Sequence, residues 1–140
     1  MRERALKRTS LLLALLCLCA ARCWAEGIVV IAHPSVPKTD LATLQRIYTG
    51  KVIEINGVSI VPINAPPGSF ERNRFLRDFL QQDEEKYTAY WTVRRYIGKG
   101  SPPREVASAD MAVAVQSTPG AIGYLPDSEL RPGMAILMRR

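Results

Sequence analysis

The stretch Gly27-Ile28-Val29-Val30-Ile31-Ala32-His33 is continuously apolar and rich in β-branched residues. A run of this kind is typical of a strand that is covered on both faces of a sheet. Pro34 and Pro37 follow and end it. A helical pattern begins directly afterwards, and short β-rich runs alternate with helical periods through the rest of the chain. The sequence therefore predicts one domain of the α/β class.

Four segments have the spacing of apolar residues that an amphipathic helix requires. Asp40, Ser69 and Asp83 are suited to cap three of them at the N-terminus. We expect helices from Asp40 to Tyr48, from Ser69 to about Gln81, from Asp83 to near Gly98, and from about Arg104 to Ser117.

The apolar positions of two helices predict which side chains face the core. In the second helix the expected inward residues are Phe75, Leu76, Phe79 and Leu80, with Arg72, Arg74, Arg77 and Asp78 mostly outward. Trp91 of the third helix joins Phe75 and Phe79 as a core candidate. In the fourth helix the expected packing residues are Val106, Ala109, Val113 and Ala114.

The remaining β-rich runs lie between turn signals. Residues 53–55 and 59–63 flank Asn56-Gly57, a strong signal for a hairpin turn. Thr118-Pro119-Gly120 leads into a predicted strand from Ala121 to Leu125, and a last strand is expected from Ala135 to Met138.

Residues 1–25 differ in composition from the rest of the chain. Four basic residues within the first eight precede the apolar run Leu11–Ala21, and Cys23-Trp24-Ala25 follows. This three-part pattern predicts a secretory signal peptide that is cleaved before Glu26. The alternative, an uncleaved membrane anchor, is disfavoured because a spanning helix needs roughly 18 apolar residues. We therefore expect an exported protein, periplasmic or secreted, whose mature domain is residues 26–140.

The basic character of the chain belongs mostly to this N-terminal segment. The whole chain has 19 basic and 13 acidic residues, a formal net charge of +6. Five of the basic residues and one of the acidic residues lie within positions 1–25, so 14 and 12 remain, a net charge of +2. No nucleic-acid partner is expected on this balance. All three cysteines also precede Glu26, which leaves no disulfide or cysteine ligand in the mature domain.

The mature sequence is poor in residues that carry catalysis. His33 is its only histidine, which excludes a histidine zinc cluster, and no phosphate-binding or dinucleotide-binding glycine motif is present. The adjacent Glu84 and Glu85 suit a helix N-terminus. We predict a protein that is not an enzyme and that holds no metal or cofactor. A small hydrolase that uses Ser69 or Ser35 with His33 is the weaker alternative.

The best chemical feature is Pro67-Gly68-Ser69, where a strand passes into a helix. Free amides at the helix start and the Ser69 hydroxyl can converge on an anion, and Arg72 can add a charged donor one turn later. The candidate anion site is therefore Gly68, Ser69 and Arg72. The alternative is that Ser69 only caps the helix and that the arginines form a solvated face.

Several motifs together resemble one known family, the substrate-binding proteins of phosphate ABC transporters, which belong to the type II periplasmic binding proteins. They are Leu41-x-x-Leu44-x-x-Ile47-Tyr48-x-Gly50-Lys51, Ile60-Val61-Pro62, Arg72-x-x-Phe75, Tyr90-Trp91, Gly98-Lys-Gly-Ser-Pro-Pro103 and Thr118-Pro-Gly-Ala-Ile-Gly-Tyr124. The resemblance implies a central mixed β-sheet flanked by helices. It covers one of the two lobes that close on the anion in that family, together with the crossover strand that leads into it.

The resemblance also implies which residues would meet a ligand. The phosphate loop of the family resembles Arg-Ser-Asp-Gly-Ser-Gly-Thr, and Gly68 and Ser69 match it by position. Ala65 and Glu71 stand where the family has arginine and threonine, which predicts weak or altered anion binding. The first expected function is a non-enzymatic, solute-binding-like protein for phosphate or another small anion. The second is a ligand-free interaction module that docks on a periplasmic or membrane protein. A second copy of the chain, in a homodimer, is a further candidate partner.

Overall fold

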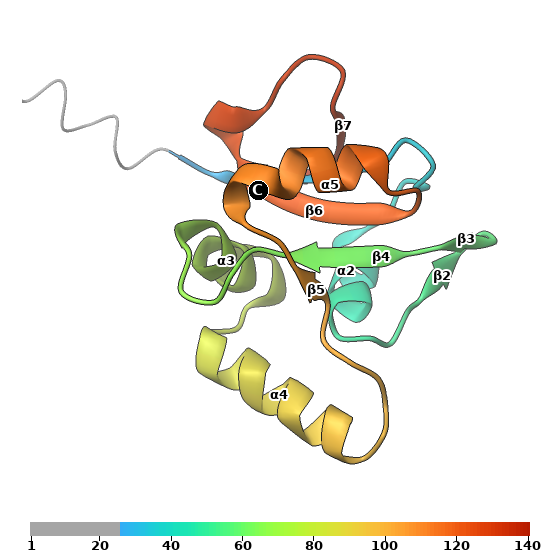
Figure 1. Cartoon of the computed structure of the whole chain (residues 1–140), viewed down its shortest axis with the longest axis vertical. Coiled ribbons are helices and arrows are strands. Elements are labelled where there is room, and N and C mark those ends of the chain that lie inside the picture. Colours follow the sequence, from blue (N-terminus) through green and yellow to red (C-terminus); the bar gives the residue numbers. More distant parts are fainter. Residues whose placement is uncertain (1–25) are drawn as a thin grey trace, which may run out of the picture.

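A computed structural model describes residues 26–140, so the expected signal peptide lies outside the described residues. The domain is built on a sheet of five strands in the order β5-β4-β6-β1-β7 (Figure 1). The strands are β1 (Ile28–Ala32), β4 (Val61–Asn64), β5 (Arg104–Glu105), β6 (Ala121–Pro126) and β7 (Ala135–Arg139). The sheet is mixed, because β4 runs parallel to β5 and β6, whereas β1 is antiparallel to β6 and β7.

The apolar run that opens the domain lies where its composition predicts. All five residues of β1 are buried, and the strand has neighbours on both edges, β6 and β7. Because helices cover the two faces of this part of the sheet, every side chain of β1 meets the core. The predicted α/β class and the central mixed sheet flanked by helices are confirmed.

The helices are α2 (Leu41–Tyr48), α3 (Phe70–Phe75), α4 (Glu84–Tyr96) and α5 (Met111–Ser117), with a π-helical turn at Leu76–Leu80 that continues α3 and short 3-10 turns at Ser108–Asp110 and Asp127–Glu129. The three predicted caps are confirmed: the side chains of Asp40, Ser69 and Asp83 each accept a hydrogen bond from a backbone amide of the first turn. Their local signals were sufficient because a cap contacts only its own helix.

Helices α3 and α5 cover opposite faces of β6. A side chain at Gly123 would collide with Met111 and Val115 of α5, whereas the ring of the next residue, Tyr124, stacks on Phe75 of α3 at 4.0 Å between centroids. Helix α2 lies on the α3 side, since Tyr48 packs on Phe75 at 4.6 Å. Helix α4 lies at the outer edge of that side (Figure 1).

The predicted hairpin is present, but it is separate from the main sheet. Strands β2 (Glu54–Ile55) and β3 (Val58–Ser59) form their own two-stranded sheet. Asn56 and Gly57 both have positive φ, 49° and 79°, as a tight hairpin turn requires. The predicted run 59–63 therefore divides between β3 and β4, which belongs to the five-stranded sheet.

The predicted helix from Arg104 to Ser117 is wrong in its first half. Arg104 and Glu105 form β5 and pair in parallel with Ile63 and Asn64 of β4. The helix proper begins at Met111, so the buried phase also differs: Met111 and Val115 are buried, whereas the expected packing residues Ala109 and Val113 are exposed. The backbone hydrogen bonds of residues 104–105 are made to β4, which is about 40 residues away in the sequence. A local helical pattern cannot reveal such a pairing.

Three buried tyrosines tie the helices to the sheet through their hydroxyl groups. Tyr48 Oη donates to the carbonyls of Ile63 at 2.9 Å and Ile122 at 3.1 Å, and Tyr87 Oη donates to the carbonyl of Tyr48 at 2.9 Å. Tyr124 Oη donates to Asn64 Oδ1 at 3.0 Å. Burial raises the pKa of all three hydroxyls above their ordinary value. No helix within residues 26–140 has the length and apolar character needed to span a membrane.

Candidate functional site

The loop between β4 and α3 brings Gly68 and Ser69 to the carboxyl end of a parallel strand. Gly68 has φ +82°, a backbone conformation that glycine adopts without strain, and no other atom lies within 4 Å of the place that a Cβ would take. Ser69 Oγ accepts from the amide of Arg72 at 3.3 Å and donates to the carbonyl of Pro66 at 2.7 Å. The capping role of Ser69 is therefore confirmed, and its hydroxyl is engaged within the loop.

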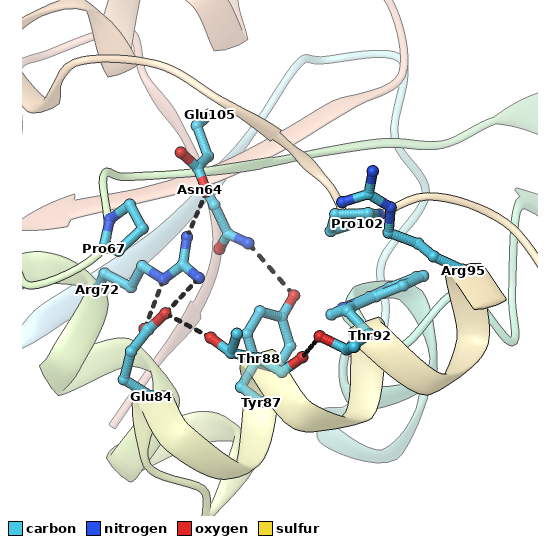
Figure 2. A pocket seen from close by; sticks show the side chains of 11 residues that line it. Asn64, Pro67, Arg72, Glu84, Tyr87, Thr88, Thr92, Arg95, Pro102 and Glu105 are labelled. Carbon is cyan, nitrogen blue, oxygen red and sulfur yellow. Dashed lines mark hydrogen bonds and ion pairs between the residues drawn. The ribbon is translucent and has the colours of Figure 1, made fainter.

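The side chain of Arg72 is buried, which contradicts the expected outward orientation. Its Nε and Nη2 donate to the two carboxylate oxygens of Glu84 at 2.8 and 2.7 Å, a bidentate pair. Its Nη1 donates to Glu105 Oε1 at 3.0 Å and to the carbonyl of Ala65 at 3.3 Å. Ser69 and Arg72 are thus neighbours at the backbone, but the guanidinium turns toward α4 and β5 and is held by two carboxylates (Figure 2).

The electrostatics of this cluster keep Arg72 charged. Burial acts to lower the pKa of Arg72, but the hydrogen bonds and negative charge of Glu84, assisted by Glu105, outweigh it and raise the pKa above its ordinary value. The neighbouring Glu71 is also engaged, since its Oε2 accepts from Ser108 Oγ at 3.0 Å. Arg72 and Glu71, the two charged residues at the start of α3, are therefore both hydrogen-bonded to other side chains of the domain.

A cavity of about 450 Å³ lies beside this cluster, between α4 and the ends of β4 and β5. Figure 2 shows the Arg72, Glu84 and Glu105 cluster at one end and Arg95 near Pro102 at the other. The volume falls within the range of small-molecule sites in proteins. Sequence reasoning selected Arg72 from this lining but missed the cavity, because its walls come from segments as far apart as residues 64 and 105.

The aromatic residues of α4, Tyr87, Tyr90, Trp91 and Tyr96, divide between core and surface. Tyr87 and Trp91 are buried and line the cavity, Tyr90 is half-buried, and Tyr96 is 92% exposed. Gly50 has φ +72° and a Cβ there would lie 2.7 Å from the Trp91 ring, so the end of α2 packs directly on the indole. Trp91, Phe75 and Phe79 are all core residues, as expected.

The structure places His33 beside Ser35 rather than Ser69. Ser35 Oγ lies 2.8 Å from His33 Nδ1 and accepts from the amide of Gly120 at 2.9 Å. In residues 26–140 no carboxylate is hydrogen-bonded to the His33 ring, so the third member of a catalytic triad is missing there. The same residues contain no group of three histidine, cysteine, aspartate or glutamate side chains placed to hold a metal ion.

The chain is similar in structure to known proteins, although its sequence alone matches none. No protein-family model and no curated protein matches the chain. Among solved structures, a phosphate ABC transporter substrate-binding protein with bound phosphate from Clostridium perfringens is 24% identical, with a TM-score of 0.58 over 80% of this chain and 44% of that one.

Two further solved structures are similar to this chain in fold. An ABC-type phosphate transport receptor from Vibrio cholerae is 13% identical, with a TM-score of 0.61 over 81% of this chain and 46% of its own. PstS from Borrelia burgdorferi is 15% identical, with a TM-score of 0.58 over 80% and 46%. The chain spans less than half the length of each protein. It therefore has the fold of phosphate ABC transporter substrate-binding proteins, as a single periplasmic-binding-protein-like lobe.

Proposed function

We propose that this chain is an exported, non-enzymatic, solute-binding-like protein. The observation that carries the proposal is the shared fold with three substrate-binding or transport-receptor proteins over 80% or more of this chain. The cavity beside the β4 to α3 loop provides a space for a solute. Thr88 Oγ1 in its lining donates to Glu84 Oε1 at 3.0 Å, but that carboxylate is paired with Arg72 and is therefore a poor general base, which favours binding over catalysis.

Phosphate binding at Gly68, Ser69 and Arg72 is part of this proposal, and we expect it to be weak. The Arg72 guanidinium is already occupied by Glu84 and Glu105, two carboxylates that take the place of an external anion. The carboxylate of Glu71 adds negative charge at the start of α3. A single lobe also leaves one side of an anion hydrated, so only one set of donors acts on it.

Amide NMR titration of the exported protein with sodium phosphate tests this site. We expect shifts confined to residues 68–72 and an affinity in the millimolar range or weaker. Glu71→Thr removes the adjacent charge and restores a hydroxyl donor, so it should strengthen binding, while Ser69→Ala should weaken it. Glu129→Gln, on an exposed turn far along the chain, is the charge-matched control. Micromolar phosphate binding by the unaltered protein would contradict the pairing of Arg72 with Glu84 and Glu105. The absence of a saturable shift would contradict the proposed anion site.

A second candidate function is an interaction module that docks on a periplasmic or membrane protein. Val93, Tyr96 and Ile97 favour it, because they are 59%, 92% and 56% exposed and lie close together at the C-terminal end of α4, where Ile97 is the residue after the helix. A photo-crosslinking residue at position 96 should capture one defined protein in the cell, and the same residue at position 128 should not. A crosslinked product of twice the chain mass would identify a homodimer, and equal capture from both positions would contradict the docking face.

A further inference from the structure

Positive charge is concentrated in two segments of the domain. Residues 41–53 contain two basic residues and no acidic residue, and residues 86–104 contain five basic residues and no acidic residue. The seven are Arg46, Lys51, Lys86, Arg94, Arg95, Lys99 and Arg104. The rest of residues 26–140 has seven basic and twelve acidic residues, a net charge of −5. The small net charge of the domain is therefore the sum of a strongly basic part and an acidic part.

The tertiary structure brings the two basic segments together at the C-terminal ends of α2 and α4. Tyr90 Oη of α4 donates to the carbonyl of Thr49 at 2.7 Å, and a Cβ at Gly50 would lie 2.7 Å from the Trp91 ring. Arg94 reaches the same turn, because its Nη2 donates to the carbonyl of Gly50 at 3.4 Å. Helix α4 forms the outer end of the domain, so the two helix ends lie side by side at its surface (Figure 1).

The basic side chains at these helix ends have no carboxylate partner. None of the ion pairs within residues 26–140 involves Arg46, Lys51, Arg94 or Lys99. The two lysines are exposed, and their backbone amides donate to the carbonyls of Arg46 and Arg94, each at 2.8 Å. Each lysine is therefore held beside the last turn of its helix. The helix dipole favours cations at this position, but it leaves their charge facing solvent.

Exposed apolar side chains lie among these cations. Val93, Tyr96 and Ile97 are all more than half exposed, and they are three and four residues apart at the end of α4. We call them, together with Arg46, Lys51, Arg94 and Lys99, the basic-apolar face. Aliphatic side chains gain free energy when they leave water, which a soluble polyanion does not offer them. A bilayer offers both a layer of phosphate groups and an apolar phase directly beneath it.

We propose that the basic-apolar face docks this protein on the surface of a membrane rich in anionic lipid. The four cations lie at the lipid phosphates, and Val93, Tyr96 and Ile97 enter the headgroup layer. The net negative rest of the domain is repelled by the same lipids, which orients the molecule with this face toward the bilayer. The inference goes beyond the proposed solute-binding function. It assigns the exposed end of α4 to lipid rather than to a protein, because protein surfaces usually carry charges of both signs.

Vesicle sedimentation with the protein purified after expression of the full chain tests the proposal. One set of vesicles contains equal parts of phosphatidylglycerol and phosphatidylcholine, and the other contains phosphatidylcholine alone. We expect binding to the first set at low salt, little binding to the second, and release in about 1 M sodium chloride, where the Debye length falls to about 3 Å. Equal binding to both sets, or no binding to the anionic set at low salt, would overturn the proposal.

Charge variants with a matched control locate the contact. Lys51→Gln and Lys99→Gln should each weaken binding to the anionic vesicles about fivefold, the usual effect of one basic residue near such a surface. Lys38→Gln is the control, because Lys38 is exposed and precedes the N-terminal cap of α2, at the other end of that helix from Lys51. Equal losses in all three variants would overturn the face as the site of contact.

Apolar variants test whether the face enters the bilayer. Val93→Ser should weaken binding to the anionic vesicles about tenfold, since one aliphatic side chain loses its burial. Val113→Ser is the matched control, because Val113 of α5 is also exposed but lies outside the face, and it should leave binding unchanged. Unchanged binding of Val93→Ser would contradict entry of α4 into the headgroup layer.

A fluorophore reports the same contact directly. After the predicted cleavage no cysteine remains in the chain, so one can be introduced and labelled with an environment-sensitive dye. Tyr96→Cys should give brighter emission with the anionic vesicles, and Ser128→Cys, on an exposed turn, should not. Capture of one protein by crosslinking from position 96, without vesicle binding, would overturn lipid docking in favour of a protein partner. Phosphate titration tests solute binding separately, so failure of one proposal does not imply failure of the other.

Discussion

At the scale of single residues, Arg72 is the side chain whose environment departs most from its sequence signal. Removing one partner of a buried ion pair costs about 3 to 5 kcal/mol. Glu84 and Glu105 are 30% and 49% exposed, so water can reach them once the guanidinium is gone. We expect Arg72→Ala to lower the free energy of unfolding by about 3 kcal/mol, the lower end of that range, as measured by urea denaturation.

The matched control for this prediction is Arg77→Ala, since Arg77 lies five residues further on. Its side chain is 64% exposed and pairs only with the neighbouring Asp78 at 3.2 Å. Exposed pairs contribute about 0 to 1 kcal/mol, so this change should leave the urea midpoint nearly unaltered. Equal effects of the two substitutions would show that Arg72 is solvated in solution, contrary to its buried pairing.

At the scale of the elements, α3 depends on its cap more than the longer helices do. It has six α-helical residues before the π-helical turn, and the Ser69 hydroxyl joins its first turn to the carbonyl of Pro66. Ser69→Ala should lower the free energy of unfolding by about 0.5 to 2 kcal/mol and speed hydrogen exchange of the Arg72 amide. Ser69→Asp keeps an acceptor at the cap and should restore most of both. An unchanged exchange rate in Ser69→Ala would contradict the cap.

At the scale of the whole molecule, the buried tyrosines make stability sensitive to alkaline pH. The pKa values of Tyr48, Tyr87 and Tyr124 are raised in the folded state because burial disfavours the charged phenolate. Their contribution is complete below the unfolded value of about 10, and it is lost as pH rises toward the folded values, by about 1.4 kcal/mol per pH unit for each tyrosine.

Circular dichroism and phenolate absorbance, followed together above pH 10, check this prediction. We expect the three buried tyrosines to ionise only as the secondary structure is lost, so the two transitions should coincide. Tyr96→Phe, at a position that is 92% exposed, should leave the unfolding transition in place. Ionisation of all tyrosines before any loss of ellipticity would mean that the three rings are accessible to solvent in the folded protein.

The predicted export concerns the whole chain, and processing tests it. The basic start, the short apolar run and the small residue at Ala25 predict cleavage before Glu26. The intact mass of the exported product should match residues 26–140. A product that retains residues 1–25, or that carries a lipid on Cys17, Cys19 or Cys23, would contradict the predicted signal peptide.

The sequence by itself determined the features that depend on neighbours along the chain. The buried strand β1, the caps at Asp40 and Asp83 and the Asn56-Gly57 turn all follow from local composition and backbone preference, and all are confirmed. The resemblance to a known family implied a mixed sheet, but the order of its strands was not predicted, because pairing between distant strands leaves no periodic signal in one sequence.

The tertiary structure alone decided the character of the candidate site. Arg72 meets Glu84 from 12 residues away and Glu105 from 33 residues away, and no spacing rule links these positions. The same long-range pairing made residues 104–105 a strand rather than a helix. The cavity exists only because α4 is placed against the ends of β4 and β5. Local conformational preference depends on a few adjacent residues. A site of this kind brings together residues that are far apart in the sequence, and only tertiary packing and burial can do that.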